Sequence, residues 1–223
     1  MRYPGGKGKC YPRLINLMPP HTAYIESHLG GGAVMRHKRP ATINIGVDLD
    51  PIVIGRWRSR RSAPCQLVEA DATSFLTGYP FQGGELVYAD PPYLSTTRRQ
   101  SRVYRRDYTY EDHEQLLAVL LSLPCNVMIS GYDNDLYRSR LSGWRVTSFT
   151  SMTHTGLRDE YVWMNFPEPS ELHETSFLGD NYRDRQTVKR RHQRLLDRFD
   201  RMPPIERLSV LDALNERFGR GCE

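Results

Sequence analysis

The 223-residue sequence lacks several features that define well-known classes of protein. It contains no internal repeat, no apolar segment of the secretory type near its start, and no apolar run approaching the roughly 20 residues of a membrane span. Its four cysteines are scattered, without the spacing of a metal or redox site. We therefore expect no membrane association and no metal, and unpaired thiols indicate a reducing, cytoplasmic environment.

What the chain does contain is a modest excess of positive charge, +5 with a pI of about 9.1, which permits a polyanionic partner. Its length suits one ordinary domain with an appendage. The composition changes after Pro167, so we expect a domain over 1–167, a linker over 168–183 and a basic helical hairpin over 184–223.

The most informative stretch is the apolar run 86–89 followed by Asp90, Pro91, Pro92 and Tyr93. The run has the length of a buried parallel strand, and the prolines end its ladder pairing. Asp90 is therefore predicted at the carboxyl end of a strand, the edge where open α/β sheets bind ligands. Its carboxylate and the Pro91 carbonyl are a pair of acceptors suited to an exocyclic amine of a base, with the Tyr93 ring for stacking. Taken alone, the motif is equally consistent with a strand-ending turn and a surface tyrosine.

Earlier strand ends carry similar signals. Gly30, Gly31 and Gly32 follow a predicted strand over 22–26, at a turn typical of nucleotide-binding sheets but without the dinucleotide spacing. Asp48 ends a predicted strand over 42–48, about 20 residues after the glycine turn, where a ribose-binding acid is found in such folds. Its alternative role is to cap the next helix, for which Asp50 is also available. Asp71 follows the predicted third strand, 65–69, as a helix N-cap or an acceptor for an adenine amine.

The remaining chain completes an α/β pattern. We predict a helix over 111–123, a strand over 126–131, a helix over 135–141, and an antiparallel pair over 144–150 and 160–165 joined by a polar loop over 153–158. Basic residues form two groups that are either nucleic-acid contacts or solvated charge. The first is a loop with Arg98, Arg99, Arg102, Tyr104, Arg105 and Arg106, and the second, in the helical tail, includes Lys189, Arg190 and Arg191.

In this order the motifs resemble those of the Dam-like (alpha-group) N6-adenine DNA methyltransferases. The resemblance spans residues 2–166 and is carried by residues 3–7, 26–33 and 90–93, with later pieces at 111–113, 129–132 and 160–165. It implies a Rossmann-like, mostly parallel sheet with an antiparallel final strand, and S-adenosylmethionine as cofactor. DNA is the implied partner, and its target adenine would be flipped out of the duplex. A bacterial or phage origin is implied too.

The resemblance also assigns roles. Asp90, Pro91, Pro92 and Tyr93 become the catalytic motif. The implied cofactor site comprises Tyr3, Gly5, Gly6, Lys7, Glu26, His28, Gly30, Gly31, Gly32, Asp48, Leu49, Asp71, Ala72 and Asp90. Within it, Glu26, Gly30 and Gly32 would hold the methionine end of the cofactor, Asp48 would bind the ribose hydroxyls and Asp71 the adenine amine.

Two departures from the family pattern stand out. Ser27 and His28 replace a proline and an aromatic residue, and only a loop fits between Asp71 and Asp90, where relatives insert a target-recognition domain. We therefore expect low or short-sequence specificity. Cytosine N4, RNA adenine and a non-catalytic nucleic-acid-binding relative stay open as alternatives, and the tail is expected to contact DNA, a partner subunit or the main domain.

Overall fold

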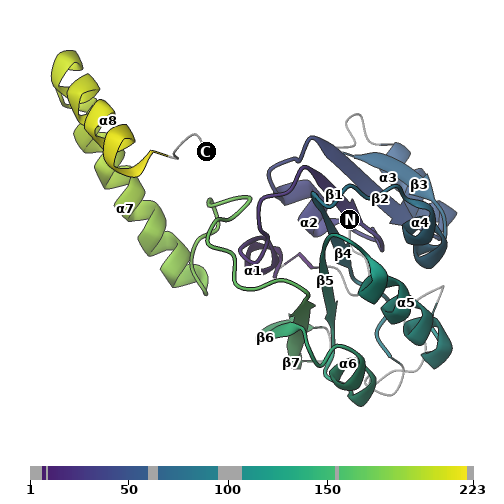
Figure 1. Cartoon of the computed structure of the whole chain (residues 1–223). Helices are drawn as coiled ribbons and strands as arrows, with labels where there is room; N and C mark the ends of the chain where they lie inside the picture. The colour runs from purple at the N-terminus through teal and green to yellow at the C-terminus, as the bar shows by residue number, and fades with distance from the viewer. Residues whose placement is uncertain (1–6, 9, 60–64, 95–106, 154–155, 220–223) are drawn as a thin grey trace. The chain divides into compact units, whose positions relative to one another are not determined.

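The computed structural model describes residues 7–8, 10–59, 65–94, 107–153 and 156–219, and the chain divides into two compact units, 1–175 and 176–223 (Figure 1). The first unit contains one seven-stranded sheet in the order β3-β2-β1-β4-β5-β7-β6. Its strands are β1 (Ala23–Glu26), β2 (Ile43–Asp48), β3 (Gln66–Glu69), β4 (Glu85–Ala89), β5 (Asn126–Gly131), β6 (Arg145–Thr153) and β7 (Gly156–Met164).

Strands β1 to β5 pair in parallel, whereas β7 runs antiparallel to both of its neighbours. This is the Rossmann-like sheet with a reversed strand that the sequence predicts, so the predicted fold class is confirmed. The strand order reverses between β1 and β4, and ligands of open α/β sheets bind outside the carboxyl ends of the strands at such a switch point.

Helices cover the sheet, and its central strands β1, β4 and β5 are buried on both faces. One face carries Ile25, Val87 and Ile129 and packs against apolar residues of the helices α4 and α5. On β1, Tyr24 and Glu26 point to the face opposite Ile25. The Lys38 ammonium, at the end of α2, lies over the Tyr24 ring. Glu26 accepts a hydrogen bond from Met35 N within α2. The helices of this unit are α1 (Tyr11–Ile15), α2 (Ala33–His37), α3 (Pro51–Arg58), α4 (Ala72–Gly78), α5 (Tyr110–Ser122) and α6 (Asp135–Arg140).

One predicted loop is wrong. We expected a polar loop over 153–158, but β6 continues to Thr153 and β7 already begins at Gly156, so most of that stretch pairs in the hairpin. The pairing is possible because an antiparallel ladder accepts polar side chains on a face that reaches solvent. The predicted strand and helix bounds elsewhere differ from the observed ones by only a few residues.

The second unit contains two helices, α7 (Tyr182–Asp200) and α8 (Pro204–Phe218), which lie side by side as a hairpin (Figure 1). Asn181 caps α7 by accepting a hydrogen bond from Asp184 N at 3.0 Å. Pro204 opens α8 at a position where a helix needs no N–H donor. Among the described residues, no helix combines the length and apolar character needed to cross a membrane.

Candidate active site

The turn that follows β4 holds the centre of the candidate site. Asp90 Oδ1 accepts hydrogen bonds from Lys7 Nζ at 2.7 Å and from Ser130 Oγ at 2.9 Å. Both contacts use the same carboxylate oxygen, and Asp90 Oδ2 has no hydrogen-bond partner among the residues that the structure describes. A carboxylate has acceptor positions on both oxygens, so Asp90 is anchored by one oxygen and keeps the other for a ligand.

Lys7 joins this turn to β7. Its ammonium donates to the Tyr93 hydroxyl at 2.5 Å and pairs with Glu160 Oε1 at 2.9 Å, while the Tyr93 hydroxyl donates to the same Glu160 oxygen at 2.8 Å. Lys7, Tyr93 and Glu160 are all at most 7% exposed. Lys7 thus donates hydrogen bonds to Asp90 and Tyr93 and forms an ion pair with Glu160, so the cluster is a buried, charge-assisted network rather than a surface pair.

Among the residues that the structure describes, the network contains one cation and two carboxylates, and the pKa values of Lys7 and Asp90 reflect that ratio. Burial lowers the pKa of Lys7, but Asp90 and Glu160 outweigh this effect and raise it well above its usual value. Burial raises the pKa of Asp90, since the opposing effect of Lys7 is offset in part by Glu160. Lys7 is therefore charged at neutral pH, and Asp90 is a stronger base than an exposed aspartate.

The Tyr93 ring is fixed at both ends. Its hydroxyl is held in the network, and its ring meets Tyr132 edge-to-face with centroids 4.5 Å apart, while the Arg158 guanidinium lies 5.2 Å from the Tyr132 ring. A ring with a bonded hydroxyl and an aromatic neighbour loses its rotational freedom. The catalytic motif predicted from the sequence is thus a rigid turn, with Pro91 buried and Pro92 half-buried.

The glycine turn after β1 is built around Asp48. Asp48 Oδ2 accepts from Gly30 N and Asp48 Oδ1 from Asp50 N, both at 2.8 Å. Gly30 and Gly32 adopt the left-handed region, with φ of 45° and 52°, and a Cβ at Gly32 would clash with the Trp57 indole. Asp48 therefore positions the turn, while Asp50 caps α3 by accepting from Ile52 N at 2.9 Å. Burial raises the pKa of Asp48, although its two backbone donors oppose the shift.

Glu26 lies at the carboxyl end of β1 and opposite Tyr88 of β4. Glu26 Oε2 accepts from Tyr24 OH at 3.1 Å and from Met35 N at 3.0 Å. The side chain is buried, and burial raises its pKa to about 8. This carboxyl thus holds the start of α2 beside the glycine turn, with Oε1 unpartnered among the described residues.

His28, the departure from the family pattern, occupies the same region. One ring nitrogen lies 3.0 Å from Ser27 Oγ and the other 2.9 Å from the Tyr108 hydroxyl, and the two rings meet edge-to-face. Burial lowers the pKa of His28 to about 3, so the ring is neutral. His28 therefore packs as a flat ring tied to the segment that precedes α5, a contact that the sequence does not reveal.

Asp71 caps α4. Its carboxylate accepts from Ser74 N at 2.9 Å and from the Thr73 hydroxyl. Burial raises the pKa of Asp71, but these hydrogen bonds outweigh it and lower the pKa overall. The capping role is thus present, and the carboxylate keeps acceptor positions at the carboxyl edge of the sheet, next to β3.

Part of the predicted site lies outside the described residues. That part comprises Tyr3, Gly5 and Gly6 of the N-terminal motif and Arg98, Arg99, Arg102, Tyr104, Arg105 and Arg106 of the basic loop. The described part brings Lys7, Asp90 and Tyr93 into one cluster and Gly30 and Asp48 into another. Leu49 and Ala72 follow Asp48 and Asp71 directly, and Gly31 lies within the glycine turn.

The sequence analysis missed Glu160 and Ser130 as site residues. Both residues are buried. The sequence signal for Glu160 was an acid directly before the apolar residues of a predicted strand, because burying an unpaired charge there would cost free energy. Ser130 links the site to β4, because its hydroxyl lies 3.0 Å from the buried Tyr88 hydroxyl. Among the described residues, no group of His, Cys, Asp and Glu is arranged to hold a metal ion.

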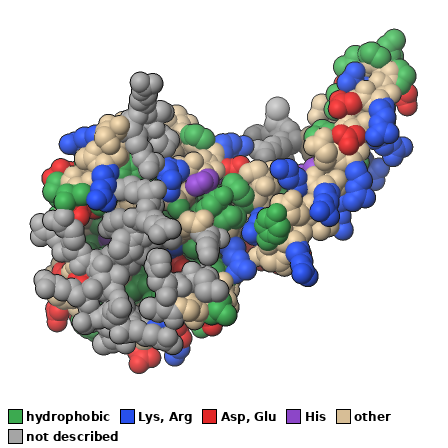
Figure 2. All heavy atoms as spheres, turned by 180° about the vertical axis from the view of Figure 1, so that it is seen from behind, with side chains coloured by type: hydrophobic (Ala, Val, Ile, Leu, Met, Phe, Trp, Pro, Cys, Tyr) green, Lys and Arg blue, Asp and Glu red, His purple; other side chains and the backbone are tan. Residues whose placement is uncertain are grey.

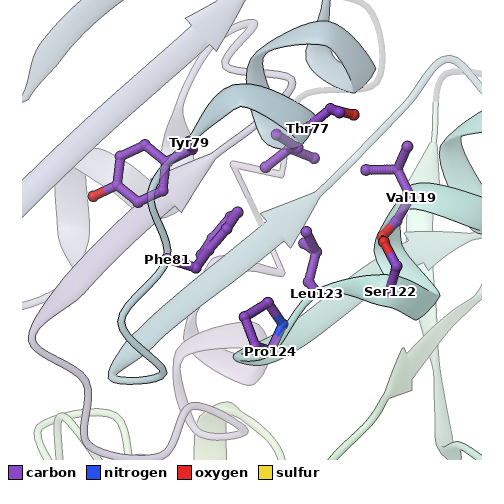
Figure 3. A pocket seen from close by; sticks show the side chains of 8 residues that line it. Thr77, Tyr79, Phe81, Val119, Ser122, Leu123 and Pro124 are labelled. Carbon is purple, nitrogen blue, oxygen red and sulfur yellow. The ribbon is translucent and has the colours of Figure 1, made fainter.

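A separate groove of mixed polarity lies at the opposite edge of the sheet. Tyr79 and Phe81 come just before β4, and Leu123 and Pro124 come just before β5, and all four line the groove (Figure 3). Because β4 and β5 are parallel, the groove is at their amino ends and Asp90 is at the carboxyl edge. The groove is therefore not part of the candidate active site.

Comparison with known proteins gives similarities only among solved structures. No protein-family model and no curated protein matches the chain. TrmK of M. capricolum, in complex with S-adenosyl-homocysteine, is 10% identical, with 92% of this chain and 93% of that chain covered and a TM-score of 0.47. A dimethyladenosine transferase from Plasmodium falciparum is 12% identical, with coverages of 74% and 63% and a TM-score of 0.47. Precorrin 8W decarboxylase from Methanobacterium thermoautotrophicum is 12% identical, with coverages of 73% and 91% and a TM-score of 0.46.

Proposed function

We propose that the chain is an S-adenosylmethionine-dependent methyltransferase that modifies the N6 amine of adenine in DNA. The observation that carries this proposal is the arrangement of Asp90. One of its oxygens is anchored by Lys7 and Ser130, and the other has no hydrogen-bond partner among the described residues, at the strand end next to the Pro91 carbonyl. An exocyclic amine has two hydrogens, which Asp90 Oδ2 and the Pro91 carbonyl are suited to accept.

Accepting both hydrogens fixes the amine and directs its lone pair out of the plane of the ring. Lys7 and Glu160 support this step by holding Asp90 and Tyr93, so the acceptors need no rearrangement when the base arrives. The raised pKa of Asp90 makes its carboxylate a good acceptor for a proton-bearing nitrogen. We assign Tyr93 to the face of the target base, which must be flipped from a duplex at a cost of a few kcal/mol or taken from a single strand.

The residues at the switch point fit the proposed cofactor. Each oxygen of Asp48 accepts one hydrogen bond from a backbone N–H. Each oxygen therefore keeps an acceptor position that can bind a ribose hydroxyl. The left-handed Gly30 and Gly32 allow close approach to the backbone. We assign Asp71, whose carboxylate keeps acceptor positions, to the adenine amine of the cofactor. When bound, S-adenosylmethionine supplies a methyl group activated by a sulfonium.

The first test is methyl transfer from labelled S-adenosylmethionine to duplex DNA, single-stranded DNA and RNA, with the product nucleoside identified by mass spectrometry. N6-methyladenine in DNA is the expected product. N4-methylcytosine or methylated RNA would replace the substrate, since the same acceptor pair fits those amines. Transfer to none of them would contradict the proposal.

The mechanism is tested by Asp90→Asn, which keeps the shape of the side chain but replaces one acceptor with an amide donor. We expect loss of transfer, at least 100-fold, with cofactor binding retained. Asp135→Asn, an exposed carboxylate at the start of α6, is the matched control and should behave as wild type. Equal activity of Asp90→Asn and wild type would overturn the mechanism.

Sequence specificity is a further part of the proposal. Between Asp71 and Asp90 the chain forms only α4, a short connection and β4, so this interval holds no target-recognition domain. We therefore expect methylation at many short sites. Sequencing of methylated DNA checks this, and modification confined to one site of four or more bases would contradict it.

A further inference from the structure

We infer that α7 of the C-terminal unit binds the phosphodiester backbone of the nucleic-acid substrate through one arginine ridge, without reading bases. This inference rests on the proposed function for the existence of a nucleic-acid substrate. The ridge consists of Arg183, Arg190, Arg191, Arg194, Arg198 and Arg201, all of which are exposed.

The ridge follows from helical geometry. At 3.6 residues per turn these arginines lie within an arc of about 100° around the helix axis. The apolar residues Val188, Leu195 and Phe199 fall within a second arc, whose centre is roughly 110° away from that of the arginine arc. Charge and apolar surface are therefore segregated, and Lys189, which we grouped with the basic residues from sequence, lies outside the arginine arc.

The ridge is also electrostatically unsatisfied. Among the described residues, no ion pair joins a ridge arginine to a carboxylate, whereas Arg138, Arg140 and Arg207 are each paired with an acid. Lys and Arg side chains line one edge of the helical hairpin in the space-filling view (Figure 2). Unpaired guanidinium groups that repel one another along a helix are stabilised by an anionic partner.

The spacing suits a chain of phosphates. Arg190, Arg194 and Arg198 are separated by four residues each, so neighbouring side chains leave the helix about 5–6 Å apart. Arg is the residue that binds phosphate oxygens in a fork, and such contacts fix position without sequence information. A backbone grip of this kind gives the enzyme affinity without the target-recognition domain that it lacks between Asp71 and Asp90.

The test uses the full chain and fluorescence anisotropy with labelled nucleic acids, between about 50 and 200 mM salt. The variant Arg194→Gln/Arg198→Gln removes two ridge charges. We expect its slope of log K against log salt to fall by about two, because each phosphate contact contributes roughly one. The loss should be the same for DNA duplexes of different sequence, and kcat at saturating substrate should be unchanged while KM rises.

The matched control is Arg56→Gln/Arg58→Gln. It removes two exposed arginines from the last turn of α3, which runs back from the carboxyl edge of the sheet. This control should keep the wild-type slope. A ridge variant with the wild-type slope would overturn the inference, as would a wild-type chain without salt-dependent binding. Loss of binding only to phosphatidylserine vesicles would overturn it too, and would assign the ridge to a lipid surface.

These outcomes are separable from failure of the proposed function. The salt slopes are measured a second time with both charge variants introduced into the Asp90→Asn chain. This measurement reports binding alone and does not depend on methyl transfer. Intact slopes with no methyl transfer in wild type would reject the activity and keep the ridge. An RNA duplex as a second labelled probe shows whether the backbone preferred is DNA or RNA.

Discussion

Replacing Lys7 by methionine removes a buried ammonium that pairs with two carboxylates, those of Asp90 and Glu160. Asp90 Oδ1 and Glu160 Oε1 lie 2.7 Å and 2.9 Å from its ammonium, and Lys7 itself is 6% exposed. Removing one partner of a buried ion pair leaves an uncompensated charge and typically lowers the free energy of unfolding by about 3–5 kcal/mol. We expect a loss in this range, measured by urea denaturation at pH 8.

The loss should depend on pH. Burial already raises the folded-state pKa of Asp90, and without the opposing charge of Lys7 this pKa rises further above its unfolded value. Carboxyls of this kind destabilise the fold above their folded pKa, and the penalty fades as pH falls toward the unfolded value of about 4. Lys7, whose pKa is raised, stays charged in wild type across this range. The difference between the two proteins should therefore be smaller at pH 5 than at pH 8.

A surface pair with a similar separation provides the control. Arg140 Nη2 lies 2.9 Å from Glu114 Oε1, but both side chains are more than a third exposed. Arg140→Met should therefore cost less than about 1 kcal/mol. The double variant Lys7→Met/Glu160→Gln should recover about 0.5–3 kcal/mol relative to the sum of the single changes. A loss below 1 kcal/mol for Lys7→Met, or one that is independent of pH, would refute the reasoning.

Two further changes test the glycine turn and Glu26. Gly32→Ala should lower the free energy of unfolding by about 1–2 kcal/mol because of the left-handed backbone, and by more because the new Cβ clashes with Trp57. The same change should weaken cofactor binding. The control is Gly55→Ala, which has open space at its Cβ and should raise the free energy of unfolding by about 0.5–1 kcal/mol. Calorimetry and cofactor titration check both, and an Ala at 32 that is tolerated without loss contradicts the packing. The pKa of Glu26 is raised to about 8, so wild-type stability contributed by this group falls as pH rises from about 4.5 through 8. Glu26→Gln should therefore gain stability relative to wild type between pH 5 and pH 8 in urea denaturation, and a constant difference would contradict the assigned burial.

The parts of the site that could be predicted from the sequence are those indicated by short patterns of neighbouring residues. The apolar run before Asp90, the strand before Asp48 and the glycines after Glu26 all indicate strand ends, and parallel strands bring such ends to one edge. Helix caps are equally local, which is why Asp50 and Asp71 were recognised as candidates. The fold class followed from the order of these signals.

The parts that the sequence did not predict depend on distant residues. The contact between Lys7 and Glu160 joins segments more than 150 positions apart, and no local pattern encodes it. The pairing of Gly156–Arg158 in β7 was missed because polar residues there read as a loop, whereas the ladder with β6 is what makes them a strand. The hydrogen bond between His28 and Tyr108 was missed because these residues are also far apart in the sequence.

The reversed strand explains why Glu160 reaches the site at all. In a parallel strand, only the residues at the end of the strand lie at the carboxyl edge of the sheet. Because β7 is antiparallel to β5, Gly131 at the end of β5 pairs with Tyr161, in the middle of β7, and Glu160 is the next residue toward that edge. The reversal thus delivers a buried acid to the same place as Asp90, and Lys7 neutralises one charge of the two. We therefore interpret the antiparallel strand as the element that fixes Tyr93 and Asp90 in one arrangement, with Asp90 Oδ1 bound within the network and Oδ2 left for the proposed chemistry.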